Sequence, residues 1–151
     1  QVCVSISSIL RTRLGPSQWA VTGTDFAVEI GDDIRYPDVL VEALGENTPL
    51  SMSTTTPVLL VEVLSPSSVG RDLSVKLAEY VSLPSLQCYI VASQDEAMVW
   101  VWQRDSGTGA FSQIATEIAG PEGKISITSL GIEIALEEIY SGIIPMPPSR
   151  A

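Results

Sequence analysis

Val58-Leu-Leu-Val-Glu-Val-Leu64 is the stretch of sequence that decides the fold. It is the longest apolar run of the chain and is interrupted only by Glu62. A run this short and this rich in branched side chains is typical of a central strand that is buried on both faces. It falls far short of the roughly 20 apolar residues that span a bilayer, so we expect no membrane segment.

The residues after this strand predict the next two elements. Ser65-Pro66 ends the strand, and a helix is predicted over residues 72–82. The apolar stripe of this helix, which should face the sheet, consists of Leu73, Leu77, Tyr80 and Val81. Pro84 ends the helix, and a further core strand is predicted over residues 88–92.

More elements are predicted on either side of this core. Helical spacing of apolar residues, stopped by Gly15-Pro16, predicts a helix over 2–14. A half-buried strand should run over 19–30 and end in the segment 26–30. Another should run over 34–42, entered through Pro37, before a loop over 45–56. The C-terminal part should hold a strand over 97–103 paired with one over 110–118, a short strand over 124–128 and an amphipathic segment over 130–140. These elements predict one α/β domain over residues 1–144, with a mixed central sheet flanked by helices, and a loose tail over 145–151.

The composition excludes several classes of chemistry. The chain has 151 residues and no histidine, so it has no Ser-His-Asp or Cys-His triad and no histidine-bound zinc. Any catalysis must use carboxylates, lysine, hydroxyls and metals that prefer oxygen ligands. Cys3 and Cys88 are far apart and form no CxxC motif, and no secretory signal is visible, so we expect reduced thiols in a cytoplasmic protein.

Two acidic residues and one lysine stand out as candidates for chemistry. Glu62 lies in the middle of the apolar strand, where a carboxylate is costly unless it is paired, hydrogen-bonded or bound to a metal. Asp38 follows Pro37 in the preceding predicted strand and has the same status. Lys76 lies on the following helix, where the plainer interpretation is a surface pair with Asp72 four residues earlier. The plainer interpretations of Glu62 are a position on an edge strand or a buried salt bridge.

The order and spacing of these residues resemble the Uma-two family of the PD-(D/E)XK nuclease superfamily. The resemblance rests on Arg35-Tyr-Pro-Asp-Val39, on Val61-Glu-Val-Leu-Ser-Pro-Ser-Ser68, on the spacing of Asp72, Lys76 and Tyr80, on Gln87-Cys-Tyr-Ile-Val91, and on residues 132–140. It implies a restriction-endonuclease-like core. In the superfamily a lysine usually follows the second acid by two positions, and this chain has Leu64 at that place. The resemblance implies that in the Uma-two family the lysine has moved to the next helix, where this chain has Lys76.

The resemblance also implies a reaction and a set of site residues. Asp38, Glu62 and the backbone carbonyl of Val63 would bind Mg²⁺ or Mn²⁺, and Lys76 would orient the attacking water or stabilise the charge that develops on the phosphoryl group. Around this centre, three further residues are candidates for supporting roles: Asp72, Tyr80 and Gln87. Of these, Tyr80 has packing as its simpler role.

Two functions from different classes therefore compete. The first is a metal-dependent endonuclease that hydrolyses phosphodiester bonds in DNA, with homodimerisation expected for an enzyme that cuts duplexes. The second is a catalytically degenerate nuclease fold that serves as a binding or assembly module, which the net charge of −10 and Gln87, at a position where the family often has an acid, both favour. A weaker third alternative uses Trp100 and Trp102 as an interaction surface. In a nuclease, the acidic pair should be rimmed by some of Arg11, Arg13, Arg35, Arg71 and Lys76.

Overall fold

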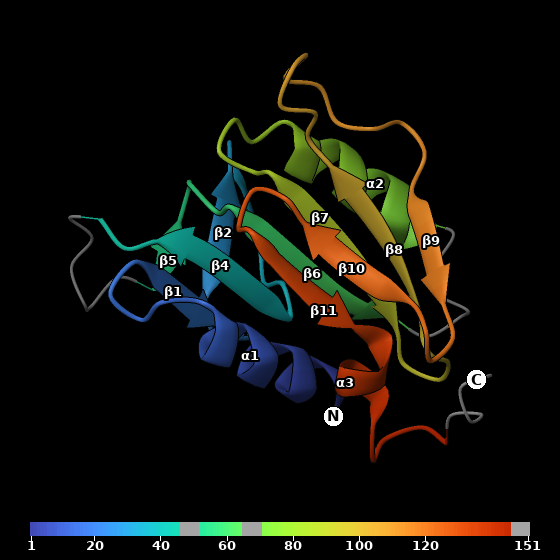
Figure 1. Ribbon diagram of the computed structural model, residues 1–151. Helices are drawn as coiled ribbons and strands as arrows, with labels where there is room; N and C mark the ends of the chain where they lie inside the picture. The colour runs from blue at the N-terminus through green and yellow to red at the C-terminus, as the bar shows by residue number, and fades with distance from the viewer. Residues whose placement is uncertain (46–51, 65–70, 146–151) are drawn as a thin grey trace.

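A six-stranded mixed sheet forms the centre of the computed structural model, which describes residues 1–45, 52–64 and 71–145, without the side chains of Arg71 and Asp72 (Figure 1). The strand order is β1-β4-β6-β7-β8-β9. These strands are β1 Trp19–Thr22, β4 Val39–Ala43, β6 Leu59–Leu64, β7 Cys88–Ser93, β8 Met98–Gln103 and β9 Thr116–Ala119. Strand β6 lies between β4 and β7, which confirms the central position predicted for this stretch.

One parallel pair makes the sheet mixed. Strands β6 and β7 run parallel, and helix α2, Arg71–Val81, lies between them in the chain, as a crossover requires. All other neighbours in this sheet are antiparallel. Leu59, Leu60 and Val61 of β6 are completely buried, because both faces of the sheet are covered.

Each face of the sheet has its own apolar core. On one face, α1 (Val2–Arg13), α3 (Leu136–Tyr140) and the hairpin of β10 (Lys124–Ile127) and β11 (Ile132–Ala135) pack on residues such as Val61 and Ile90. On the other face, α2 packs with a small sheet of order β3-β2-β5. Its strands are β2 Ala27–Ile30, β3 Asp33–Arg35 and β5 Ser53–Thr54.

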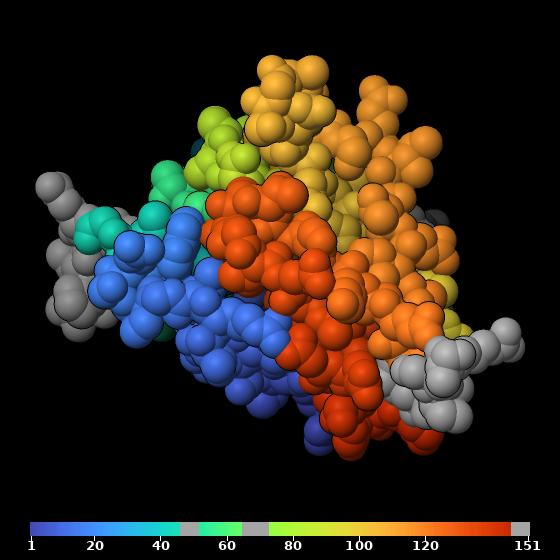
Figure 2. Space-filling view, viewed as in Figure 1, coloured from blue at the N-terminus to red at the C-terminus, as the bar shows by residue number. Residues whose placement is uncertain are grey.

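A hydrogen bond and an ion pair join helices α1 and α3. Ser5 Oγ donates to the carbonyl of Ile139 at 2.7 Å, and the guanidinium of Arg13 pairs with Glu138. Figure 2 shows the outcome on the surface, where the blue N-terminal helix abuts the red C-terminal segment. The face that carries the first apolar core is thus closed by both ends of the described chain.

The strand predicted over 34–42 is wrong, because this segment forms two strands in two different sheets. Strand β3 ends at Arg35 in the small sheet, and β4 begins at Val39 in the large one. Pro37 lies between them and has no N–H to donate to a ladder, so the chain leaves one sheet there and enters the other. Asp38 therefore precedes a strand instead of lying within one.

Four other predictions need correction. The segment 19–30 is not one strand, because it forms β1 in the large sheet and β2 in the small one. The stretch 110–118 pairs with β8 only from Thr116 onward, and Phe111 makes a single bridge to Arg104. The guanidinium of Arg104 organises the intervening turn, because it lies 4.6 Å from the Phe111 ring centroid and donates to carbonyls at Leu83, Leu86 and Gly109. The amphipathic segment over 130–140 is a strand followed by a helix, and the predicted loop over 45–56 contains β5.

Some predictions concern residues outside this description. The turn at residues 65–68 and all but the first residue of the predicted tail belong to that part of the chain. The extent of the domain, residues 1–144, stays a prediction. No helix among the described residues has the length and apolarity that crossing a bilayer demands.

Candidate active site

The carboxylate of Glu62 is bonded to two side chains of helix α2. Its side chain is only 5% exposed, and its oxygens accept from Lys76 Nζ at 3.1 Å and from Tyr80 Oη at 2.9 Å. Lys76 and Tyr80 reach the same carboxylate because residues four apart lie on one face of a helix. Burial raises the pKa of Glu62, and the charge and hydrogen bonds of Lys76 and Tyr80 partly offset this rise.

Asp38 lies beside this cluster at the start of β4. Strands β4 and β6 are paired with Val39 opposite Val61, so the next position along β6, Glu62, is the neighbour of Asp38. Asp38 Oδ2 accepts a hydrogen bond from the backbone N–H of Val63 at 2.7 Å. The negative charge of Asp38 contributes to the raised pKa of Glu62, which places the two carboxylates within electrostatic reach. The structure thus brings Asp38, Glu62 and Lys76 together.

An ion pair that the sequence did not reveal joins the Asp38 segment to helix α2. Arg35 Nε and Nη2 donate to the two carboxylate oxygens of Glu79, each at 2.7 Å. The hydrogen bond from Arg35 is the main reason why the pKa of Glu79 is lowered. Arg35 stands three residues before Asp38 and Glu79 three residues after Lys76, so the pair fixes one candidate residue relative to the other.

The other candidates lie in different places. Tyr80 both packs in the core and touches Glu62. Gln87 is not part of the cluster, because β7 pairs with β6 with Val91 opposite Glu62, which puts Gln87 roughly 13 Å farther along the strand. Its Nε2 donates to the carbonyl of Ser85 at 3.3 Å. The side chain of Asp72 lies outside the described part of the chain, and the role of the Val63 carbonyl stays a prediction.

The tryptophans of β8 do not form an open stacking surface. Trp102 is buried and stacks on Tyr89 with ring centroids 5.6 Å apart, and Tyr89 meets Tyr80 edge to face at 5.2 Å. Trp100 packs against the same cluster. This aromatic group packs against α2 through Tyr80, so Trp100 and Trp102 act as core residues in this fold.

The basic residues expected to rim the acidic pair are only partly there. Lys76 contacts Glu62, and Arg35 approaches through Glu79. Arg13 is paired elsewhere, with Glu138, and Arg11 lies in a pocket that Asp38 also lines. The side chain of Arg71 is not described. Among the described side chains, the acidic pair therefore has few basic residues around it.

The residues present fit a cation that prefers oxygen ligands. Among the described residues, no group of three or more His, Cys, Asp and Glu side chains is placed to hold a metal. The two neighbouring carboxylates of Asp38 and Glu62 are oxygen donors, which suit Mg²⁺ or Mn²⁺ and not zinc. A cation at this position would relieve the repulsion between Asp38 and Glu62.

Comparison with known proteins identifies the family. A family model described as "Uma2: Putative restriction endonuclease" matches residues 1–137. The chain belongs to the Uma2 family. The resemblance to the Uma-two family drawn from the motifs is thereby confirmed.

Relatives of this Uma2 chain occur in cyanobacteria. It is 29% identical over 134 residues to "Uncharacterized protein sll1609" of Synechocystis sp. (strain ATCC 27184 / PCC 6803 / Kazusa), a match that covers 85% of the chain and 73% of the relative. It is 25% identical over 145 residues to "Uncharacterized protein slr1290" of the same strain, covering 94% of the chain and 74% of the relative.

A solved structure shares the fold. The crystal structure of a "putative nuclease belonging to DUF820 from Anabaena variabilis ATCC 29413" superposes with a TM-score of 0.74 at 15% identity, covering 93% of this chain and 78% of that one. The Uma2 chain therefore has a nuclease-like fold, and the predicted mixed central sheet flanked by helices is confirmed.

Proposed function

We propose that this Uma2 protein is a metal-dependent endonuclease that hydrolyses phosphodiester bonds in DNA. The observation that carries the proposal is the buried Glu62 in the central strand, which lies beside Asp38 and 3.1 Å from Lys76. Burying a carboxylate in an apolar core costs free energy, and binding a metal is one function that offsets this cost. The description of the family as restriction endonucleases agrees with a nuclease site.

The residues of this cluster have distinct proposed roles. Asp38, Glu62 and the carbonyl of Val63 hold Mg²⁺ or Mn²⁺. When bound, such an ion polarises a phosphoryl oxygen and lowers the pKa of a bound water. Lys76 is 29% exposed, so its ammonium can contact Glu62 and still face a substrate, where it orients the attacking water or stabilises the charge on the phosphoryl group. Tyr80, through Glu62, and the Arg35–Glu79 pair, through the Asp38 segment, are positioning residues.

The proposal includes a homodimer in the cytoplasm with DNA as its partner. Cys3 and Cys88 are free thiols, which suits a reducing compartment. One candidate site per chain and two strands per duplex favour a two-fold symmetric pair of subunits. Sedimentation of the full chain with and without duplex DNA measures this directly, and a monomer under both conditions would limit the enzyme to one strand at a time.

The central test compares Asp38→Asn, Glu62→Gln and Lys76→Gln with the wild type. Titration calorimetry with Mn²⁺ should show binding in the wild type and in Lys76→Gln, and its loss in the two acid variants. Cleavage of duplex DNA in Mg²⁺ should fall at least about a hundredfold in all three, because each removes a charge from the reacting centre. Lys124→Gln is the control, because that side chain is 62% exposed and outside the cluster. Cleavage that survives in Asp38→Asn and Glu62→Gln would contradict the proposal.

The alternative function is a degenerate nuclease fold that binds or assembles without cutting. It is favoured by the net charge of −10 and by the absence, within the described residues, of a third acidic side chain at the site. Glu62 is also bonded by two protein donors already. If millimolar Mn²⁺ produces no heat with the wild type, with or without DNA, this alternative becomes the better description.

A further inference from the structure

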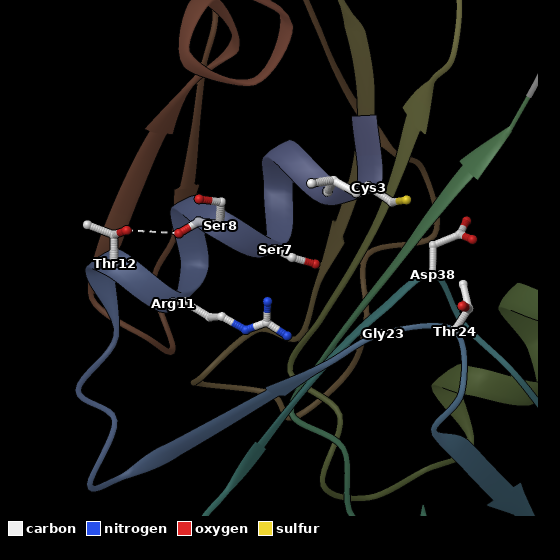
Figure 3. A pocket seen from close by; sticks show the side chains of 9 residues that line it. Cys3, Ser7, Ser8, Arg11, Thr12, Gly23, Thr24 and Asp38 are labelled. Atoms are coloured by element: carbon white, nitrogen blue, oxygen red, sulfur yellow. Dashed lines mark hydrogen bonds between the residues drawn. The ribbon is translucent and has the colours of Figure 1, made fainter. Parts of the chain in front are cut away.

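A pocket between helix α1 and the start of β4 has no role in the function proposed above. Its volume is about 410 Å³, and it is lined on one side by α1 and on the other by Gly23, Thr24 and Asp38 (Figure 3). Ser7 and Arg11 of α1 point into it, and Asp38 closes the opposite end. Asp38 therefore belongs both to the candidate active site and to the wall of this pocket.

Arg11 differs from the other basic residues in what it contacts. Among the described side chains, Arg13, Arg35, Lys76 and Lys124 all pair with a carboxylate. Arg104 has all of its guanidinium nitrogens bonded to backbone carbonyls. Arg11 makes a single hydrogen bond, from Nη2 to the carbonyl of Val21 at 3.1 Å. Its exposed side chain lines the pocket, and no described carboxylate forms an ion pair with it.

Ser7 adds a hydroxyl donor to the wall of the pocket. Its side chain is buried, with 9% of the residue exposed, and it lines the pocket. Within the described part of the chain its hydroxyl has no hydrogen-bond partner, whereas Thr12 on the same helix donates to the carbonyl of Ser8 at 2.9 Å. The buried polar atoms without a partner in the described residues are those of Thr22, Glu42 and Tyr89, so the Ser7 oxygen is reached by water and can donate to a ligand that takes the place of this water.

The chemistry of the pocket selects the ligand. A guanidinium and hydroxyls are donors that suit a phosphate group, and the fork of an arginine binds phosphate oxygens in pairs. Asp38 would repel an anion at its own end of the pocket, so the anion belongs at the Arg11 end. In a protein with a net charge of −10, a guanidinium that has no ion-pair partner among the described residues and lies in a pocket that reaches Asp38 is a distinctive placement.

We propose that this pocket binds a backbone phosphate of the nucleic-acid strand, one that flanks the phosphate cleaved at Asp38 and Glu62. The inference rests on the proposed nuclease function, and it adds the path that the nucleic-acid strand takes across the protein. Cys3 lines this pocket and also a second one that reaches Val63 at the end of β6. Arg11 lies eight residues farther along α1, or roughly 12 Å. The strand therefore runs along α1, from the acidic pair toward Arg11.

The test is the affinity of the full chain for a fluorescein-labelled DNA strand, measured by anisotropy with Ca²⁺ in place of Mg²⁺. Arg11→Gln should weaken binding about tenfold near 0.1 M salt, because a charge-assisted contact is lost. The slope of log K against log salt should fall by about 0.7 for a single strand or about 0.9 for a duplex. Ser7→Ala should weaken binding less and leave the slope unchanged. Lys124→Gln, which removes the same charge outside the pocket, should change neither quantity.

The outcomes separate this inference from the proposed function. If Arg11→Gln binds and responds to salt like the wild type while Asp38→Asn abolishes cleavage, the flanking site is wrong and the nuclease stands. If the wild type neither binds nor cuts nucleic acid, both are wrong. A parallel titration with inorganic phosphate identifies the source of the anion. Phosphate binding that depends on Arg11, combined with DNA binding that does not, would assign the pocket to a free anion and overturn the proposal.

Discussion

Tyr80 donates its phenolic hydroxyl to Glu62 Oε1 at 2.9 Å, and both side chains are almost completely removed from water. Burial and the adjacent carboxylate raise the pKa of Tyr80, so this hydroxyl keeps its proton and donates to the ionised carboxylate of Glu62. Helix α2 thus presents two donors of different kinds, a neutral hydroxyl and the ammonium of Lys76, to one carboxylate. The stability of the protein and its affinity for metal should both depend on this cluster and its supports.

Replacing Tyr80 with Phe should lower the free energy of unfolding by about 1–3 kcal/mol, because Glu62 Oε1 loses its donor in a buried place. Urea denaturation at neutral pH measures the effect. Tyr36→Phe is the matched control, since Tyr36 is 61% exposed and should change stability by less than about 0.5 kcal/mol. Equal effects of the two substitutions would mean that the Tyr80 hydroxyl contributes nothing to holding Glu62.

Replacing Glu62 with Gln should change how stability depends on pH. Burial raises the pKa of Glu62 above its ordinary value of 4.5, so the folded chain holds this proton more tightly than the unfolded chain. The contribution of Glu62 to stability is therefore greatest below pH 4.5 and is lost as pH rises through the raised pKa. The amide of the Glu62→Gln variant cannot titrate, so this variant should gain stability relative to the wild type as pH rises from about 4 to about 8.

Thermal unfolding of the metal-free proteins across this range measures the difference. Glu133→Gln serves as the control, because that carboxylate is 56% exposed. A constant difference between Glu62→Gln and the wild type at all pH values would show that Glu62 titrates normally in the folded chain.

Replacing Asp38 with Asn and with Ala should separate charge from hydrogen bonding. Asn keeps an oxygen that can accept from the Val63 N–H, so its melting temperature should stay close to that of the wild type while Mn²⁺ binding is lost. Ala leaves that part-buried N–H without its side-chain partner and should cost a further ~1 kcal/mol of stability, the lower end of the cost of an unsatisfied buried donor. A large loss of stability in Asp38→Asn would show that the charge itself, and not the hydrogen bond, holds the segment before β4.

The ion pair between Arg35 and Glu79 should couple the Asp38 segment to helix α2. Its side chains are 37% and 20% exposed, so a double-mutant cycle of Arg35→Gln and Glu79→Gln should give a coupling free energy of about 1 kcal/mol or less. Both single variants should also weaken Mn²⁺ binding, although neither residue is a proposed ligand. Unchanged metal affinity in both would remove their positioning role and leave the pair as a surface contact.

The sequence predicts best what is decided locally. The run of branched apolar residues predicts strand β6, and the apolar stripe predicts helix α2 and the face that it turns to the sheet. Both predictions are direct because the period of the apolar residues reflects which face of an element is covered. The grouping of Asp38 with Glu62 and Lys76 required the family resemblance, since each residue alone has an ordinary interpretation. The geometry then shows why the spacing matters: the register of β4 and β6 makes Asp38 and Glu62 neighbours.

What the sequence could not predict depends on contacts between distant segments. Arg35 and Glu79 are separated by 44 positions, and neither is unusual where it stands, so no local pattern joins them. The proline of the Tyr-Pro-Asp motif indicated a strand entrance, whereas it marks the passage from one sheet to another. Gln87 was a candidate from motif position alone, and the strand register removes it from the site.

The bond between Ser5 and the carbonyl of Ile139 has a consequence for how the molecule assembles. The two residues are 134 positions apart, so α1 is synthesised long before its partner helix exists. Until the C-terminal segment emerges, the apolar face of α1 has only part of its cover, and the loop that must close spans most of the chain. The packing of α1 is therefore completed late in folding. In a nascent chain that stalls before α3, the apolar face of α1 is exposed to chaperones or to the same helix of another copy.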